Sequence, residues 1–499
     1  MRRRTFLGTL AASPLAGTPR YPRLPAPSAV WNEEPVAIGF RKQLFVDDSI
    51  VSTRHNVTRQ QGRPRKWNGS QPLMTADRPW EQPDFGFAGY VSLVHTGSLF
   101  RMWYGAHYTE QEGYVHAYAE SDDGIHWRKP HLGLHPFPAG SQNKTNNLVF
   151  SHGGGFCCSF DPHETDPAHR YKAAYGHKRK ICACLAHSPD GLHWTPYNSG
   201  EPVTGRASDS WNQILWDEDA KAYRLFTRTD FGEGGGDREY RGTRMMTNPD
   251  VKTNPNNWTL GRSWLFDREG PGEVARRQIQ NLADWIYEGV HFGLVCVHEW
   301  PAGETEVHQT SRERDLHIRP ERDVTNLYAV TSRDADRWDL TSVYQQKPLI
   351  ERGTAGSFDQ GMIFGPSSIV TWDDRHWIYY AGAEERHWTF PKKWAIGLAT
   401  LRLDGFHYLE PWDAHDRGWV ITKPFRLEGA KLEINADASG GSLGVEVTDL
   451  EARPIQGVRR FNNADGMRLS VNVQPLRGRV VRLKFHLEKA KLFAFSVKA

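Results

Sequence analysis

The chain has 499 residues, a formal net charge of +3 and 12% aromatic residues, and 19 of its residues are tryptophan. The balanced charge excludes the clustered basic face of a nucleic-acid-binding protein, and no apolar run reaches the 18 or more residues of a membrane helix. The length allows two or three domains, and the many Trp, Tyr, Gly and Pro residues with few Met are typical of an all-β extracellular protein.

The first residues predict export. Arg2, Arg3 and Arg4 precede a short, weakly apolar run, and Ala-Pro-Ser-Ala at 26–29 offers a small-residue cleavage site. This pattern is typical of a twin-arginine signal. We therefore exclude residues 1–29 from the fold and expect a periplasmic or secreted protein.

Five cysteines do not make a disulfide framework. Cys157 and Cys158 lie on one expected strand, and Cys182 and Cys184 lie on another. One disulfide, a soft-metal site and buried free thiols are the three alternatives that this spacing leaves open.

A heptapeptide recurs along the chain at Ser121–Trp127 and Ser188–Trp194, with a degenerate copy at Ser332–Trp338. Serine, acid, turn residue and tryptophan keep the same spacing. Asp-Gly or Asp-Ala makes a tight turn, and the Trp opens the next strand and packs over that turn. Units that recur in this way bury their faces only against their neighbours, which predicts a radial array of sheets.

Taken in chain order, five such units are expected between residues 30 and 418. Their strands alternate imperfectly, as expected for sheets buried on both faces. A polar insert, Pro301–Asp323, interrupts the fourth unit and is predicted to be a long loop. The sequence therefore predicts a five-bladed β-propeller over residues 30–418, with blades at about 84–130, 146–196, 208–260, 276–340 and 357–410.

The pattern of apolar and polar residues changes from about residue 424. Leu427–Asn435, Leu443–Thr448 and Val480–Leu487 alternate cleanly between apolar and polar residues. Strict alternation indicates strands with one solvent-exposed face, so we expect residues 419–499 to form an antiparallel β-sandwich packed on the propeller.

In a propeller, the residues that start each innermost strand converge on one mouth of the axial tunnel. Carboxylates from separate blades at that mouth suit glycosidic chemistry, with one acid as proton donor and another as base or nucleophile. For each of these acids a structural role is the alternative, and Glu385 is the alternative to its neighbour. The candidate catalytic residues are Asp47, Asp209, Asp359 and Glu384.

Aromatic side chains around the mouth are expected to stack on sugar rings, and arginine, asparagine and acidic side chains to bond hydroxyls. Arginine also pairs with a substrate carboxylate or sulfate. Core packing and surface ion pairing are the alternatives. The candidate substrate-binding residues are Trp80, Glu81, Asp84, Tyr104, Trp211, Asn212, Arg228, Arg244 and Trp388.

Several motifs together resemble one family. They are Leu44–Asp48, Asp77–Glu81, Arg101–Gly105, the heptapeptide repeats, and Ala395–Ala399 followed by Asp404-Gly405-Phe406. The chain resembles secreted bacterial proteins labelled similar to glycoside hydrolase family 32, in the superfamily that also holds families 43, 68 and 130.

The resemblance implies a furanosidase-like propeller with a carboxylate site in its central funnel. The Asn-Asp-Pro-Asn-Gly and Glu-Cys type motifs of family 32 proper are absent, so invertase activity is not expected. Gln278 and Gln280 stand where the fourth blade was expected to supply an acid. Trp211 stands where related sequences often have His.

The leading hypothesis is an exported glycoside hydrolase, retaining or inverting, acting on an oligo- or polysaccharide. A polysaccharide lyase acting on a uronate-containing glycan and a non-catalytic glycan-binding propeller are the alternatives. No cofactor is expected to be required, although five-bladed relatives sometimes hold calcium or another divalent ion in the axial channel. We expect no nucleic-acid partner, and the sequence leaves the oligomeric state open.

Overall fold

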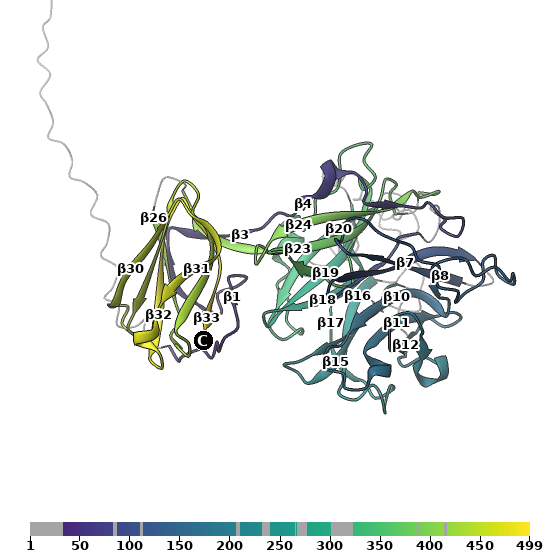
Figure 1. Ribbon diagram of the computed structural model, residues 1–499, viewed down its shortest axis with the longest axis horizontal. Helices are drawn as coiled ribbons and strands as arrows, with labels where there is room; N and C mark the ends of the chain where they lie inside the picture. Colours follow the sequence, from purple (N-terminus) through teal and green to yellow (C-terminus); the bar gives the residue numbers. More distant parts are fainter. Residues whose placement is uncertain are drawn as a thin grey trace, which may run out of the picture.

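The computed structural model describes residues 33–82, 87–109, 113–205, 210–231, 240–264, 266, 277–300, 323–387, 389–413 and 417–499. Within these ranges the regular secondary structure is almost entirely strand, with one short α-helix, α2 (Thr341–Tyr344). Short 3₁₀ turns lie at Trp67–Ser70, Pro167–His169, Tyr197–Gly200 and Gln474–Leu476. The described strands form six sheets, and the fold is therefore all-β (Figure 1).

Three of the sheets are four-stranded antiparallel meanders, each built from consecutive strands. They follow the first three predicted units. The first holds β6 (Val91–Thr96), β7 (Leu99–Thr109), β8 (Gly113–Ser121) and β9 (Leu148–Phe150). The second holds β10 (Gly153–Phe160), β11 (Tyr171–His177), β12 (Ala183–Ser188) and β13 (Thr195–Pro196). The third holds β14 (Gln213–Asp217), β15 (Ala222–Phe231), β16 (Tyr240–Asn248) and β17 (Thr259–Trp264).

The fourth and fifth predicted units join in a single nine-stranded sheet. A parallel bridge between Thr325 and Met362 connects them, and two strands from the N-terminal segment pair with β24. The members are β18 (Arg277–Tyr287), β19 (Val290–Glu299), β20 (Val324–Ser332), β21 (Met362–Phe364), β22 (Val370–Trp372), β23 (Arg375–Ala383), β24 (Trp394–Arg402), β4 (Arg65–Lys66) and β5 (Met74–Thr75).

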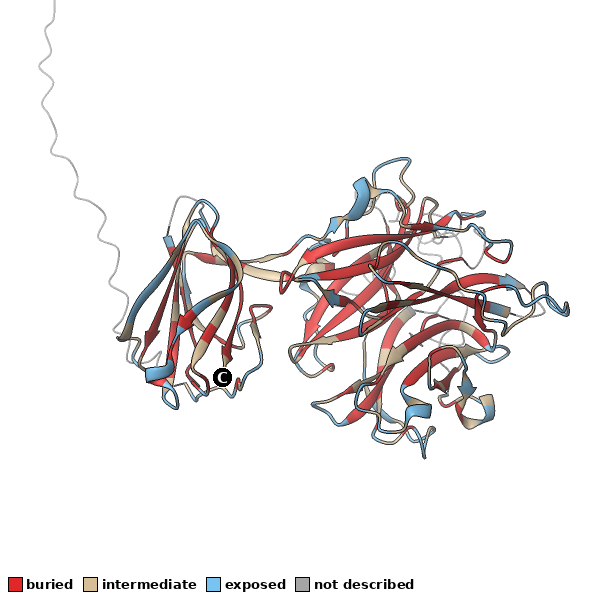
Figure 2. Cartoon of the chain, in the orientation of Figure 1, coloured by how far each residue is buried: buried red, intermediate tan, exposed pale blue. Residues whose placement is uncertain are grey.

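Two six-stranded sheets enclose a separate apolar core and draw strands from both ends of the chain (Figures 1 and 2). One contains β1 (Gln43–Leu44), β3 (Val57–Gln61), β25 (His407–Pro411), β28 (Lys431–Asp437), β31 (Asp465–Asn472) and β33 (Lys491–Lys498). The other contains β2 (Val51–His55), β26 (Arg417–Thr422), β27 (Phe425–Arg426), β29 (Ser442–Thr448), β30 (Pro454–Asn462) and β32 (Val480–Glu488). The pairing of residues 43–61 with strands after 407 differs from the division at 418 expected from sequence.

The heptapeptide turns share one hydrogen-bond pattern. In the copy at Ser188, the serine Oγ accepts the backbone N–H groups of Asp190 and Gly191, and the Asp190 carboxylate accepts those of Leu192 and His193. Gly191 has φ +78°, and its carbonyl oxygen accepts the indole N–H of Trp103 from the neighbouring sheet at 2.7 Å. Each turn therefore closes a hairpin and also links two sheets.

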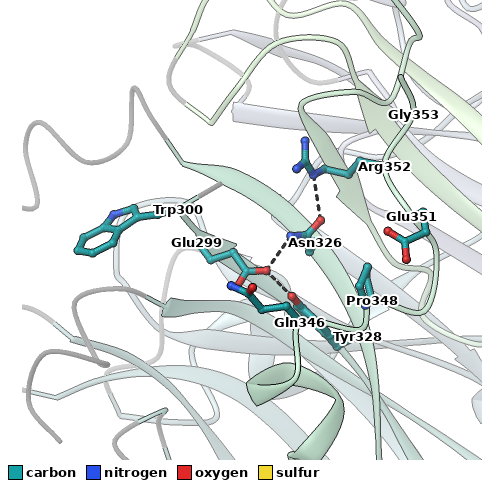
Figure 3. Close-up of a pocket in the computed structure, with 9 residues that line it drawn as sticks. All are labelled: Glu299, Trp300, Asn326, Tyr328, Gln346, Pro348, Glu351, Arg352 and Gly353. Carbon is teal, nitrogen blue, oxygen red and sulfur yellow. Dashed lines mark hydrogen bonds between the residues drawn. The ribbon is translucent and has the colours of Figure 1, made fainter. Parts of the chain in front are cut away.

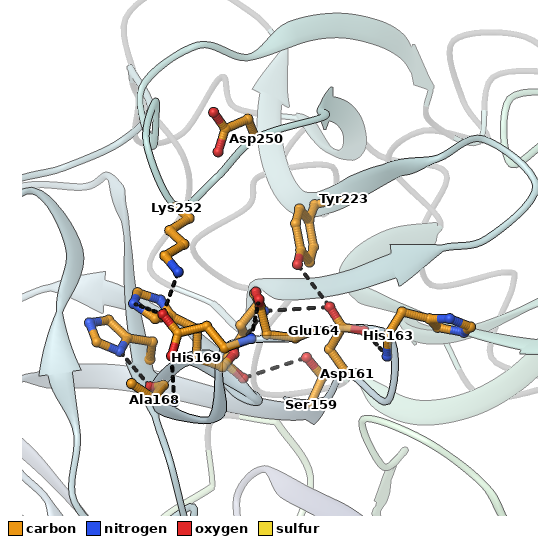
Figure 4. Close-up of polar contacts among 12 residues, drawn as sticks. Ser159, Asp161, His163, Glu164, Ala168, His169, Tyr223, Asp250 and Lys252 are labelled. Carbon is orange, nitrogen blue, oxygen red and sulfur yellow. Dashed lines mark hydrogen bonds and ion pairs between the residues drawn. The ribbon is translucent and has the colours of Figure 1, made fainter.

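A buried ion cluster ties the second meander to the third (Figure 4). The Lys172 ammonium group lies 3.1 Å from Glu164 and 3.4 Å from Asp161. The Tyr223 hydroxyl on β15 donates to the same Asp161 carboxylate at 2.8 Å. Because Lys172 and Asp161 are both buried, these partners keep their charges compensated, and the cluster fixes the contact between the two sheets.

Candidate active site

The three meanders and the nine-stranded sheet together surround one cavity. This axial pocket has a volume of about 460 Å³. Its walls come from the inner strands β6, β10, β14 and β18, and from the segment around β22. Representative lining residues are Leu93–His95, Cys158–Phe160, Gln213, Trp216, Asp284–Ile286 and Ser367–Thr371. The pocket therefore marks the axis around which these sheets are arranged.

An aromatic cluster lies toward the opposite ends of the same inner strands, and we call that end the mouth. The Tyr90 ring, one residue before β6, stacks on Trp211 at 5.3 Å between centroids and on Phe364 of β21 at 5.7 Å. Trp211 precedes β14 and donates its indole N–H to the Phe156 carbonyl of β10. Trp211 and Phe364 are buried and Tyr90 is half-buried, so Tyr90 is the more accessible member of the cluster.

Gln280 is the polar centre of the mouth. It lies at a β-bulge of β18, between Ile279 and Asn281, and a bulge re-aims the side chain. Its Nε2 group donates to the Tyr90 hydroxyl at 3.0 Å. Its Oε1 atom accepts from His298 Nε2 at 2.9 Å, and from one NH1 each of Arg228 and Arg241 at 3.3 Å.

The hydrogen bonds of His298 fit one tautomer. Since Gln280 presents its carbonyl oxygen, His298 Nε2 carries the hydrogen, and Nδ1 accepts from the Thr325 hydroxyl at 2.8 Å. The ring is buried and stacks on His387 at 3.7 Å between centroids. His298 is thus held in one orientation beside Tyr90 and the two arginines.

The two guanidinium groups approach one neutral oxygen. Both NH1 nitrogens lie 3.3 Å from Gln280 Oε1. The mouth therefore combines an aromatic surface with convergent hydrogen-bond donors.

Arg228 and Arg244 do not act together. Arg228 pairs with Thr243, whereas Arg244 pairs with Thr227, so the two side chains leave opposite faces of the sheet. Loss of solvation lowers the pKa of Arg244. Asn212 is next to Trp211 and is buried, with its Nδ2 donating to the Ser210 carbonyl at 3.3 Å.

The predicted carboxylates are placed differently from one another. Asp209 and Asp84, like the predicted sugar-binding Trp388, lie outside the described residues. Asp47 forms an ion pair with Arg333 at 2.8 Å. Arg333 follows the end of β20, whereas Thr325, at the start of that strand, bonds His298. Asp47 therefore lies at the end of the sheet opposite the mouth.

The environment of Asp47 keeps it ionised. Partial burial raises the pKa of Asp47, but the hydrogen bonds and charge of Arg333 outweigh that effect and lower it to about 2.

Asp359 and Glu384 lie toward the mouth end of β21 and β23. Asp359 is fully buried, where it forms an ion pair with Lys66 at 2.6 Å and accepts the Tyr380 hydroxyl at 2.8 Å. Glu384 lines a separate cavity of about 630 Å³, where the Gln360 side chain donates to it at 3.4 Å. Among the described residues, no hydrogen bond joins either carboxylate to Gln280.

Trp80, Glu81 and Tyr104 come together, but in a closed buried network. Glu81 accepts the Tyr104 hydroxyl at 2.7 Å on one oxygen, and Lys129 and two backbone N–H groups on the other. The Trp80 indole donates to Asn147 at 2.7 Å. Because burial leaves no side of Glu81 open and its oxygens are occupied, this arrangement supports a structural role for all three residues.

A smaller pocket of about 220 Å³ lies beside β19 and β20 (Figure 3). The buried Glu299 accepts from Asn326 at 2.7 Å and from the Tyr328 hydroxyl, and Arg277 pairs with it at 3.2 Å. Arg352 donates to Asn326 at 2.9 Å. Glu299 has donors of its own, so it resembles a compensated structural acid more than a proton donor.

Sequence reasoning missed Tyr90, Arg241 and His298. Tyr90 stands directly before β6, a place comparable to that of Trp211 before β14. Arg241, on β16, has no signal in the sequence, because its place at the mouth depends on the pairing of β15 with β16. Gln280 was recognised as a neutral residue at an expected acid position, and the structure places it at the centre of the site.

The five cysteines are free thiols, four of them buried. Across the part of the chain that the structure describes, no group of three or more His, Cys, Asp or Glu side chains is arranged to hold a metal ion. The axial pocket presents one buried carboxylate, Asp284, which bonds His291 at 2.7 Å. These residues do not fit a carboxylate-rich calcium site.

Comparison with known proteins gives distant similarities. No family model matches the chain. An uncharacterized protein of Mycobacterium tuberculosis is 26% identical over 186 residues, which are 35% of this chain and 56% of that protein. The chain thus spans little more than half the length of the curated relatives that it matches.

Solved structures similar to this chain include glycosidases. A glycoside hydrolase has 13% identity and a TM-score of 0.44, covering 68% of this chain and 92% of its own. An α-L-arabinofuranosidase of Podospora anserina has 10% identity and a TM-score of 0.41, covering 68% and 97%. A fructofuranosidase of Schwanniomyces occidentalis has 11% identity and a TM-score of 0.37, covering 85% and 98%.

The described part of the chain contains no helix with the length and apolar character needed to span a bilayer.

Proposed function

We propose that this protein is a carbohydrate-active enzyme that cleaves glycosidic bonds at the mouth around Tyr90 and Gln280. The observation that carries the proposal is the convergence of side chains from separate inner strands on Gln280, beside an aromatic cluster. Convergent polar groups around an aromatic surface are typical of a saccharide site.

Hydrolysis is the leading reaction. Asp209 stands two residues before Trp211 in the sequence, and we propose it as a carboxylate of the reaction. In a glycosidase one carboxylic acid protonates the leaving oxygen, and a second carboxylate attacks the anomeric carbon or activates water. Glu384 is the proposed second acid, because it follows β23 toward the mouth end.

A lyase is the second candidate, favoured by one observation. His298 and Tyr90 both bond Gln280, and Arg228 and Arg241 reach the same amide. A lyase needs a base to remove the proton beside a uronate carboxylate and a cation to stabilise the developing charge. The mouth contains side chains of both kinds.

Product analysis on a panel of plant, algal and microbial glycans distinguishes the reactions. Free reducing sugars that disappear in Asp209→Asn, with folding retained, support hydrolysis. Products with ultraviolet absorbance from a new double bond, lost in Tyr90→Phe or His298→Gln, establish the lyase instead. Binding without any product contradicts both reactions and leaves a glycan-binding propeller.

We propose in addition a five-bladed propeller, a sandwich and export from the cytoplasm. The five segments that line the axial pocket support a five-bladed propeller, and the pairing of residues 43–61 with strands after 407 supports a sandwich built from both chain regions. The twin arginines and the small-residue stretch at 26–29 support export to the periplasm or beyond.

A further inference from the structure

We propose that Arg352 is a positioning residue for Glu384, which it holds through Gln360 in the orientation that the reaction needs. The inference rests on the proposed function, in which Glu384 is the second carboxylate. A network of hydrogen bonds connects this acid to the interior of the nine-stranded sheet, and we call it the Glu384 network. Its members in order are Glu299, Asn326, Arg352, Gln360 and Glu384.

The Glu384 network begins at a buried carboxylate, and Figure 3 shows its first three members. Glu299, at the end of β19, is 2% exposed, and Arg277 pairs with it at 3.2 Å. Its Oε1 atom accepts the Asn326 Nδ2 group at 2.7 Å. Because the carboxylate oxygen accepts a hydrogen here, the amide of Asn326 has one orientation, with Oδ1 turned toward Arg352.

Arg352 connects Asn326 to the segment before β21. Its Nε group donates to Asn326 Oδ1 at 2.9 Å, and its NH1 group donates to the main-chain carbonyl of Gln360. Two hydrogen bonds from different nitrogens of one planar guanidinium fix the plane of that group. The segment that carries Arg352 is itself anchored on β20, because Leu349 donates its N–H to the Leu327 carbonyl at 2.7 Å.

Gln360 presents a hydrogen-bond donor to Glu384. Its Oε1 atom accepts the Gly356 N–H at 2.8 Å, so its Nε2 group is the end that faces Glu384. The next residue, Gly361, donates its N–H to the Ala383 carbonyl at the end of β23 at 3.0 Å, which keeps Gln360 beside the acid. The distance of 3.4 Å from Gln360 Nε2 to Glu384 Oε1 is longer than an ordinary hydrogen bond. The contact therefore aligns the carboxylate without saturating it.

Glu384 stays accessible in this arrangement. It is half-buried and lines the cavity of about 630 Å³, with Arg352 in the wall of the same cavity. Among the described residues its hydrogen-bond partner is the neutral Gln360, whereas Glu81 and Asp359 are each paired with a lysine. An oriented and accessible carboxylate suits a catalytic base or nucleophile, and its orientation depends on the residues that support it.

Kinetics on a glycan that the wild-type protein cleaves test whether Arg352 acts through Glu384. Arg352→Lys keeps the positive charge but lacks the planar group that reaches Asn326 and Gln360 together. We expect kcat to fall about tenfold to hundredfold with KM nearly unchanged. Gln360→Met removes only the side-chain amide and should lower kcat in the same way.

A double substitution locates the effect. The carboxylate of Glu384→Asp is too short to reach Gln360, so Arg352→Lys should cause little further loss of kcat in that background. A merely structural role of Arg352 would lower kcat equally in both backgrounds. Glu351→Gln, at the exposed residue beside Arg352, is the control and should keep the wild-type kcat. Unfolding curves show whether each variant is folded.

A crystal structure of Arg352→Lys gives a readout that needs no activity. We expect the Glu384 carboxylate to be displaced or to occupy two positions, whereas Glu351→Gln should leave it in place. A Glu384 carboxylate that keeps its single position in Arg352→Lys would overturn the inference, whether or not any glycan is cleaved.

The outcomes separate the two proposals. Equal losses of kcat in the two backgrounds, an unchanged kcat in a folded Arg352→Lys variant, or cleavage that is unaffected by Glu384→Asp would each overturn the inference and leave the enzyme standing. A displaced Glu384 in Arg352→Lys, with no cleavage of any glycan by the wild-type protein, sustains the positioning and contradicts the enzyme.

Discussion

At the residue scale, the partners of a carboxylate decide what it can do. Glu81 and Asp359 are both buried, and both have cationic or hydroxyl donors at hydrogen-bond distance. A catalytic acid needs access to substrate and a proton to give, whereas a buried carboxylate paired with lysine holds its neighbours in place. The spacing of these residues in the sequence carries no information on those partners.

Asp359→Asn tests this distinction. The change leaves the Lys66 ammonium group, which is 14% exposed, without its ion-pair partner, and we expect a loss of about 2 to 4 kcal/mol in unfolding free energy. Activity per folded molecule should be retained. Asp122→Asn, at an exposed ion pair with Arg128, is the control and should change stability far less. Loss of activity with unchanged stability would show that Asp359 takes part in the reaction.

Tyr90→Phe tests the centre of the mouth. The variant keeps the ring that stacks on Trp211 but removes the hydroxyl that accepts from Gln280. We expect kcat to fall about tenfold to hundredfold while stability changes little. Steady-state kinetics and thermal unfolding measure the two effects. Tyr379→Phe removes a hydroxyl that bonds the distant Gly124 carbonyl and should alter stability rather than kcat; equal kinetics for both variants contradict the assignment.

At the scale of elements, the heptapeptide turn links each hairpin to the next sheet. A Cβ atom at Gly191 would lie 2.6 Å from a ring carbon of Trp103, in a residue with φ +78°. Gly191→Ala should therefore cost about 2 to 4 kcal/mol, from backbone strain and the clash together.

Gly440→Ala isolates the clash. Gly440 has φ +77° but nothing within 4 Å of its Cβ position, so it should cost only about 1 kcal/mol. Chemical denaturation measures both variants. Equal losses would mean that the contact between sheets contributes nothing.

The same turns predict a sensitivity to acid. Burial raises the pKa of Asp190, but hydrogen bonds from His193 and Leu192 outweigh it and lower the pKa to about 2. A carboxylate with a depressed folded pKa stabilises the fold above its unfolded value of about 4 and loses that contribution as pH falls toward 2. Urea unfolding between these values should show falling stability, and a smaller fall in Asp190→Asn. An unchanged slope in the variant would contradict this cause.

At the scale of the whole molecule, two six-stranded sheets that draw strands from both regions of the chain enclose one apolar core. Phe45 is fully buried there, against Phe485 and Phe495 at 6.3 and 6.1 Å between ring centroids. Phe45→Ala should cost about 3 to 5 kcal/mol and reduce hydrogen-exchange protection in β32 and β33, more than 400 residues later. Phe150→Ala, the control in another core, should instead expose β10–β12. Loss of protection confined to residues near 45 would contradict a shared core.

The features that the sequence predicts are those set by residues that lie close together in the chain. The repeats, strands and alternation are local, so the all-β class and the first three meanders could be recognised from sequence. The return of residues 43–61 to strands after 407 is a long-range pairing, which periodicity cannot reveal. Trp211 and Arg228 are candidates from the sequence, and Gln280 stands out there only as a neutral residue at an expected acid position. The positions of Arg241 and His298 depend on strand register. Asp47 lies at the opposite end of the sheet, where it forms an ion pair with Arg333.

The central claim is that substrate binds at the mouth. The most direct measurement is a crystal structure of the Asp209→Asn variant soaked with an oligosaccharide that the wild-type protein cleaves. The account predicts a sugar in contact with the side chains of Tyr90 and Gln280. An oligosaccharide seated instead in the axial pocket beside Asp284, or on the two six-stranded sheets with the mouth left empty, would contradict it.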